Sequence, residues 1–416
     1  MEGLWIFIGI LMAGFVTALV IFFLTEAICR RMAPAFFPDG GMTKLPGVFR
    51  IHLRTYILMT FFLACFIPML DLAVLSYNKA RMMLVMEPSA VLNSMLELIV
   101  FILVVDTGLV VLLSRMISRS VVDPVEDMQN AMERVENGDL TARAAVFANN
   151  ELGSLADNFN QMTEGLQDRY QIRRSLALAR EVQLNLLPEE APRVEGLDVA
   201  GRLIYCDETG GDYYDYLWDG RDPDRIDIVV GDVSGHGIPS ALLMSSARAY
   251  LRQRRALPGE LAQVVEDVNR EIARDVQESG RFITLFLLRI DMPKKTLQWV
   301  RAGHEPAVLY DAATDEFEEL LGSGLPLGVS TNRRYRENRR ERFADGQIIL
   351  LATDGLWESR NPEDEMFGKQ RVRSTIRKLA SRRATEIRDG LLAALAEFAG
   401  DQKPEDDITL VVAKAR

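Results

Sequence analysis

The chain is poor in the residues that build disulfide frameworks and zinc sites. Its 416 residues include three cysteines, Cys29, Cys65 and Cys206, and none of them has metal-ligand spacing to another. Two of the three fall in or beside apolar runs. We therefore expect neither a disulfide nor a zinc site.

A dominant basic stretch is also missing. The chain has 48 lysines and arginines against 59 aspartates and glutamates, which gives a net charge of -11. Because nucleic-acid binding depends on basic side chains that contact phosphates, we expect no nucleic-acid partner. The length allows two or three domains, and the apolar residues are concentrated in residues 1–116.

Three apolar segments long enough to cross a bilayer lie in this first region. They span residues 3–24, 55–77 and 94–114. The first has no basic leader and no small-residue cleavage site, which favours a retained membrane helix over a signal peptide. Residues 1–116 are therefore expected to form a membrane region in contact with lipid.

The distribution of basic residues predicts the orientation of these segments. Five lysines and arginines lie between the first two segments, whereas only Lys79 and Arg81 lie between the second and third. The positive-inside rule then places the N-terminus outside and everything after Ser114 in the cytoplasm. Asp106 falls within the third segment, where it is either a signalling group or a neutral acid in a dimer seam.

The next region, residues 117–168, has coiled-coil spacing. Apolar residues recur at intervals of three and four from Val121 to Val135 and again from Leu152 to Leu166, with turn chemistry at 137–139 between them. The pattern continues toward Leu186 and stops at Pro188. We expect two short helices followed by a helical linker over residues 169–190.

Residues 117–168 resemble a HAMP domain. The resemblance depends on Pro124 with Glu126, GDL at 138–140, NELG at 150–153 and FNQM at 159–162. It implies a homodimer with a parallel four-helix bundle, because one chain alone cannot bury both seams. The alternative is a plain helical hairpin without a signalling role.

Past residue 195 the chain alternates strands and helices, and acidic residues stand at strand ends or beside glycines. They are Asp212, Asp232, Asp354, Asp406 and Asp407. Oxygen ligands without histidine or cysteine favour Mg²⁺ or Mn²⁺. Any single acid of this kind is more often solvated or a helix cap. In GGDYYDY (210–216), period-two alternation places Asp212 and Asp215 on opposite faces of a strand.

This region resembles the type-2C metal-dependent protein phosphatases, and most closely their SpoIIE-like bacterial branch. The motifs occur in the order typical of the family over residues 179–416 and read AREVQLNLLP, GGDYYDY, GDVSGHG, RAGHEPA, GLPLG, ATDGLWE and DDIT. The resemblance implies an α+β phosphatase domain over residues 191–416, with a β-sandwich of two antiparallel sheets flanked by helices. Segment 297–311 is read as one strand.

The resemblance also implies a site for two Mn²⁺ or Mg²⁺ ions. Asp232 would bridge the ions beside the carbonyl of Val233, and Asp354 and Asp406 would hold the first ion; these three aspartates are the expected catalytic residues. Asp212 would reach the second ion directly or through water. Asp407 is a further candidate ligand, and Asp215 is expected to be structural.

The implied activity is hydrolysis of phosphoserine or phosphothreonine on a small protein, such as an anti-sigma-factor antagonist, by a metal-activated hydroxide. The HAMP region and the linker helix would regulate it from the inner membrane of a bacterium. His236 is a candidate acid/base group, whereas His304 is read as structural. No arginine resembles a dedicated phosphate ligand.

Three other classes compete with this interpretation. A histidine kinase would need a histidine in residues 169–187, where there is none. A nucleotide cyclase would not carry GDVSGHG before a helix and DDIT near the C-terminus. A catalytically silent membrane scaffold would be expected to lose Asp232, Asp354 or Asp406, and all three are present.

Overall fold

The computed structural model of the chain describes residues 2–36, 51–82, 88–144, 149–218 and 222–416. The chain divides into two compact units, Met1–Ile172 and Arg173–Arg416. The first is helical and the second contains all the named strands of the described residues. Each unit is described by itself below.

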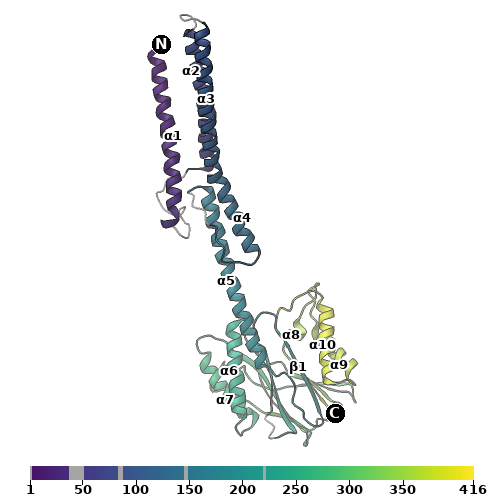
Figure 1. The fold of residues 1–416 in the computed structure, drawn as a ribbon. Helices are drawn as coiled ribbons and strands as arrows, with labels where there is room; N and C mark the ends of the chain where they lie inside the picture. The colour runs from purple at the N-terminus through teal and green to yellow at the C-terminus, as the bar shows by residue number, and fades with distance from the viewer. Residues whose placement is uncertain (1, 37–50, 83–87, 145–148, 219–221) are drawn as a thin grey trace. The chain divides into compact units, whose positions relative to one another are not determined.

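Three long helices begin the first unit (Figure 1): α1 (Glu2–Phe36), α2 (Leu53–Met82) and α3 (Pro88–Ile117). Each predicted membrane segment lies inside one of them. Within the described residues, two helical stretches, Leu53–Arg81 and Met95–Glu136, are long and apolar enough to cross a membrane. Large apolar side chains on them stay uncovered, since Phe61 is 66% exposed and Leu103 is 63% exposed. Lipid tails suit such surfaces better than water does.

A π-helical turn, η2 (Ser118–Val122), joins α3 to α4 (Asp123–Glu136). Pro124 stands in the first turn of α4, where a missing backbone N–H costs nothing. Met128 and Ala131 of α4 pack with Ala156 and Phe159 of the next helix in a small apolar cluster. Other seam positions remain exposed in the single chain, including Val125, Met132, Leu155, Met162 and Leu166.

The helix α5 runs without interruption from Glu151 to Leu186. The second helix of the HAMP region and the predicted linker helix are therefore one element. The helix α5 ends just before Pro188. A helix is expected to end there, because proline lacks a backbone N–H and its ring clashes with a preceding helical turn.

The second unit is built on two five-stranded antiparallel sheets, which confirms the predicted pair of antiparallel sheets. In spatial order, one contains β1 (Leu197–Ile204), β10 (Ile408–Ala415), β9 (Ile348–Ala352), β6 (Ala307–Asp311) and β7 (Glu316–Leu320). The other contains β2 (Tyr213–Leu217), β3 (Arg225–Val233), β4 (Ile283–Asp291), β5 (Thr296–Ala302) and β8 (Asn338–Arg340).

The prediction of one strand over 297–311 is wrong. Residues 303–306 separate β5 from β6, and the two strands belong to different sheets. Gly303 has a φ of +72°, and a Cβ there would lie 2.5 Å from the Pro326 ring. A glycine is needed at this crossing, because a side chain would meet both backbone strain and a clash.

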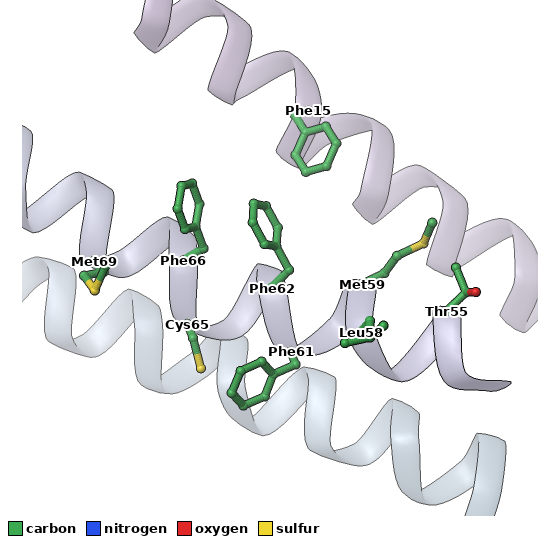
Figure 2. Close-up of a pocket in the computed structure, with 9 residues that line it drawn as sticks. All are labelled: Phe15, Thr55, Leu58, Met59, Phe61, Phe62, Cys65, Phe66 and Met69. Atoms are coloured by element: carbon green, nitrogen blue, oxygen red, sulfur yellow. The ribbon is translucent and has the colours of Figure 1, made fainter. Parts of the chain in front are cut away.

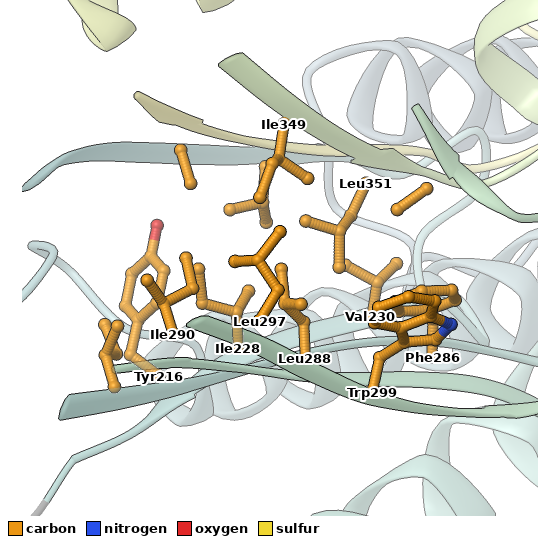
Figure 3. Packing of buried hydrophobic residues seen from close by; sticks show 14 of the residues in the cluster. Tyr216, Ile228, Val230, Phe286, Leu288, Ile290, Leu297, Trp299, Ile349 and Leu351 are labelled. Atoms are coloured by element: carbon orange, nitrogen blue, oxygen red, sulfur yellow. The ribbon is translucent and has the colours of Figure 1, made fainter. Parts of the chain in front are cut away.

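The two sheets bury a common apolar layer (Figure 3). Ile228, Val230 and Leu288 from one sheet face Ile349 and Leu351 from the other. The alternate residues of β3, Val229 and Val233, pack instead against the helices α6 (Ile238–Arg255) and α7 (Leu261–Asp275). The opposite sheet is covered by α8 (Gly355–Glu358), α9 (Gly368–Leu379) and α10 (Ala384–Ala399).

Candidate metal centre

The acidic residues of the sequence motifs come from both sheets. Asp212 precedes β2, Asp232 lies near the end of β3, Asp354 follows β9, and Asp406 and Asp407 precede β10. Asp232 interacts electrostatically with Asp354, Asp406 and Asp407, and Asp212 interacts with Asp232 and Asp407. The fold thus brings acidic residues from four separate places in the sequence into one acidic cluster, made of Asp212, Asp232, Asp354, Asp406 and Asp407.

Three members of this acidic cluster, Asp212, Asp232 and Asp406, have a raised pKa, chiefly because of burial. Burial, followed by the charges of Asp354, Asp406 and Asp407, raises the pKa of Asp232 to about 7. Burial, and then Asp232, raises the pKa of Asp212 well above its usual range. The charges that raise the pKa of Asp232 are those of other aspartates. Buried carboxylates without a cationic partner are costly, which makes this cluster fit a bound cation.

Two threonines orient Asp212. Its Oδ2 accepts hydrogen bonds from Thr353 Oγ1 at 2.8 Å and from Thr409 Oγ1 at 2.6 Å. The backbone N–H of Thr409 in turn donates to Thr353 Oγ1 at 3.0 Å. Asp212 is therefore held between β2 of one sheet and β9 and β10 of the other. Both threonines lie inside recognised motifs, but their role was not inferred from the sequence.

Asp407 braces the loop that precedes Asp212. Its Oδ1 accepts a hydrogen bond from the Cys206 backbone N–H at 2.9 Å, and its Oδ2 accepts from those of Gly211 at 3.0 Å and Asp212 at 3.4 Å. A Cβ on Gly210 would lie 1.9 Å from the same Oδ2. The glycines of GGDYYDY thus allow the backbone to approach a carboxylate closely.

The end of β3 lies close to the same loop. A Cβ on Gly211 would be 2.7 Å from the carbonyl oxygen of Val233, which is the backbone oxygen expected beside the bridging aspartate. The loop before β2 and the end of β3 therefore converge. Asp406 accepts a hydrogen bond from the Asp407 backbone N–H at 2.8 Å.

Asp215 is on the other face of β2, and its carboxylate contacts an arginine and a tyrosine instead of the acidic cluster. Its carboxylate is fully buried and accepts two hydrogen bonds from Arg252, at 2.6 and 2.7 Å, and one from the Tyr213 hydroxyl at 2.8 Å. Because Arg252 belongs to α6, this ion pair fastens that helix to the sheet. The expected structural role of Asp215 agrees with these contacts.

The two histidines of the motifs differ in their surroundings. His304 is buried, its Nδ1 lies 2.9 Å from Thr284 Oγ1, and burial lowers its pKa to about 4. These contacts agree with the structural reading of His304. The ring of His236 is exposed, its Nδ1 lies 3.7 Å from Asp207 Oδ2, and it interacts electrostatically with Asp406.

A cysteine nucleophile does not fit this region. Burial and the nearby Asp407 raise the pKa of the Cys206 thiol to about 12, so a thiolate is disfavoured. Among the residues that the structure describes, no group of three or more His, Cys, Asp or Glu side chains is arranged to hold a metal ion as it stands. The all-oxygen donor set and its uncompensated charge nevertheless suit a hard divalent cation.

A large groove of about 570 Å³ lies elsewhere, in the helical unit (Figure 2). It is lined almost entirely by apolar side chains of α1 and α2, including Phe15, Phe62 and Met69. Phe15 and Phe62 contact each other edge to face, with ring centroids 6.1 Å apart. Such a surface offers nothing to a phosphate, so the acidic cluster remains the candidate site.

Comparison with protein families gives two matches along the chain. Residues 222–416 match the model of stage II sporulation protein E (SpoIIE), and residues 116–168 match the HAMP domain. Asp212 and the strands β1 and β2 precede the first match.

Curated relatives include phosphoserine phosphatases of Bacillus subtilis (strain 168). The chain is 29% identical to RsbU over 257 residues, which cover 62% of this chain and 74% of RsbU. It is 29% identical to RsbP over 195 residues, which cover 46% of this chain and 47% of RsbP, so it spans about half of that relative. Among solved structures, the SiaA-PP2C domain of Pseudomonas aeruginosa superposes with a TM-score of 0.53 at 24% identity, covering 60% of this chain and 99% of that domain.

Proposed function

Because the chain belongs to the SpoIIE-family PP2C phosphatases, with a HAMP domain and two apolar helices before it, we propose that it is a membrane-anchored protein phosphatase. Its substrate would be phosphoserine or phosphothreonine on a small regulatory protein, such as an anti-sigma-factor antagonist. The names of RsbU and RsbP, both phosphoserine phosphatases, support this substrate class.

The acidic cluster is the proposed catalytic centre. Asp232, Asp354 and Asp406, with the carbonyl of Val233, would hold two Mn²⁺ or Mg²⁺ ions, and Asp212 and Asp407 would contribute directly or through water. A pair of such ions supplies an activated water and stabilises the charge of a transferring phosphoryl group. The observation that carries the proposal is that Asp354, Asp406 and Asp407 act on the Asp232 carboxylate.

The chain's own side chains would prepare this centre in three ways. Thr353 and Thr409 hold Asp212 in one orientation through their hydroxyl groups. Asp407 fixes the loop before β2 through three backbone N–H groups. His236 is exposed and interacts electrostatically with Asp406, and it would give a proton to the departing serine or threonine oxygen.

Hydrolysis of a phosphoserine peptide by the full chain, with and without Mn²⁺, tests the proposal. Hydrolysis that requires Mn²⁺ and stops on chelation is expected. A catalytically silent scaffold would release no phosphate under either condition. A small phosphoprotein that co-purifies with the Asp354→Asn variant would identify the substrate.

Regulation would pass from the membrane through the HAMP region. The exposed seam of α4 and α5 supports a homodimeric four-helix bundle, since apolar seam positions are normally covered. With the N-terminus outside, the phosphatase domain would lie on the cytoplasmic side of a bacterial inner membrane. Deleting residues 1–168 is expected to change the rate of hydrolysis several-fold; equal rates in the truncated and full chains would contradict this regulation.

A further inference from the structure

Gln183 is a buried polar residue near the end of α5, and the rest of the helix from residue 164 onward is exposed or half-buried. It is 3% exposed, whereas its neighbour Val182 is 62% exposed. Glutamine is rarely buried unless its amide is hydrogen-bonded. The burial of Gln183 therefore depends on the hydrogen-bond partners of its amide.

Both partners of the Gln183 amide belong to Gly210. Nε2 donates to the Gly210 carbonyl oxygen at 2.6 Å, and the Gly210 N–H donates to Oε1 at 3.4 Å. The side chain thus satisfies both backbone groups of one loop residue, much as a neighbouring strand would. The two residues belong to the same compact unit.

Gly210 lies directly against the acidic cluster. A Cβ at this position would be 1.9 Å from Asp407 Oδ2, the oxygen that accepts hydrogen bonds from Gly211 and Asp212. A change in the position of Gly210 must therefore disturb Asp407 or the backbone of Asp212. The chain of contacts runs from α5 through Gly210 to two members of the acidic cluster.

We propose that Gln183 is a positioning residue that sets the metal affinity of the acidic cluster through Gly210, an inference that rests on the proposed function. Groups that hydrogen-bond to metal ligands, without binding the metal themselves, typically weaken metal affinity 10- to 100-fold when they are lost. Because Gln183 lies on the same helix as the HAMP seam, it is also a point at which a displacement of α5 would reach the site.

The variant Gln183→Met tests this role, because methionine keeps the length and the helix propensity of glutamine but has no amide. Gln370→Met in α9, an exposed glutamine, is the matched control. In the full chain, the Mn²⁺ concentration for half-maximal hydrolysis should rise about 10-fold for Gln183→Met, with turnover at saturating Mn²⁺ close to that of the wild type. Electron paramagnetic resonance of unbound Mn²⁺ should show the same weakening without any assay of activity.

A purely structural glutamine would give a different result. Gln183→Met would then unfold at a lower temperature with unchanged Mn²⁺ affinity, and that outcome would overturn the inference while leaving the proposed function intact. A wild-type chain that binds no Mn²⁺ would instead overturn both.

Hydrogen exchange of the wild-type chain tests the same coupling without a variant. Coupling between two sites is reciprocal, so Mn²⁺ should slow amide exchange in residues 180–187. Unchanged exchange in this segment, at Mn²⁺ concentrations that protect the loop around Gly210, would contradict the role of Gln183 even if Gln183→Met did not fold.

Discussion

Two groups of buried or partly buried aspartates share one sheet of the phosphatase domain, and they differ in what surrounds them. Asp215 on β2 and Asp227 on β3 are fully buried and paired with arginines. Asp212, before β2, and Asp232, partly buried near the end of β3, lie among other acids, and two threonine hydroxyls donate to Asp212. A buried aspartate with an arginine holds the fold together, whereas buried aspartates that face one another call for a cation from outside the chain.

Asp232→Asn should give the largest effect on activity. Loss of a proposed bridging ligand should lower kcat/KM by more than about 100-fold, beyond the usual range for residues that only orient ligands. Above about pH 7, the metal-free variant should unfold at a higher temperature than the metal-free wild type, because one repelling charge is gone. Phosphopeptide kinetics and thermal unfolding in the presence of a chelator measure the two effects. A metal-free variant less stable than the metal-free wild type would contradict the view that Asp232 is repelled by the neighbouring acids.

Asp227→Asn should lower the stability of the fold and leave the Mn²⁺ dependence of hydrolysis unchanged. Asp227 receives two hydrogen bonds from Arg289, at 2.8 and 2.9 Å, and a further ion pair from Arg255. Removing one partner leaves buried guanidinium charge uncompensated, which typically costs about 3 kcal/mol or more of unfolding free energy. Denaturant unfolding measures this loss, and the Mn²⁺ dependence of the remaining folded protein should be that of the wild type. An altered Mn²⁺ dependence would mean that the arginine-paired aspartates and the acidic cluster do not act independently.

Thr409→Val should have a smaller effect, limited to the acidic cluster. Valine keeps the shape of threonine but loses the hydroxyl that donates to Asp212. Metal affinity should fall about 10-fold, as for other changes next to a ligand. Mn²⁺ titration measures the fall, and Thr375→Val, on the exposed surface of α9, is the control. Equal affinities in the two variants would show that Asp212 does not depend on this hydrogen bond.

The pH dependence of the metal-free protein should show the mildest effect. The pKa of Asp232 is raised to about 7 in the folded state, so the folded state binds a proton that the unfolded state has already released. The stability contributed by this proton is fully present below about pH 4 and is lost as the pH rises through about 7. Thermal unfolding across this range measures the loss, which should be reduced in Asp232→Asn. Mn²⁺ should bind more tightly as the pH rises, because binding displaces the proton.

Much of this arrangement could be predicted from local patterns. The apolar segments, the helical seams and the opposite faces of Asp212 and Asp215 follow from hydropathy and from the periods of helices and strands. The break between β5 and β6 could not be predicted in this way. Two neighbouring strand-forming stretches do not reveal that they pair with different sheets, although Gly303 and Pro306 were a local signal of a turn.

By itself, the sequence determined the long helical segments, which residues are acidic, and that Asp212 and Asp215 take opposite sides of the chain at β2. Only the tertiary structure decided that Asp212 meets Thr353 and Thr409, that Asp407 braces a loop about 200 residues earlier, and that Gln183 holds Gly210. The physical reason is that side-chain identity and backbone period are local properties. Hydrogen-bond partners depend on which distant strands the whole fold places side by side.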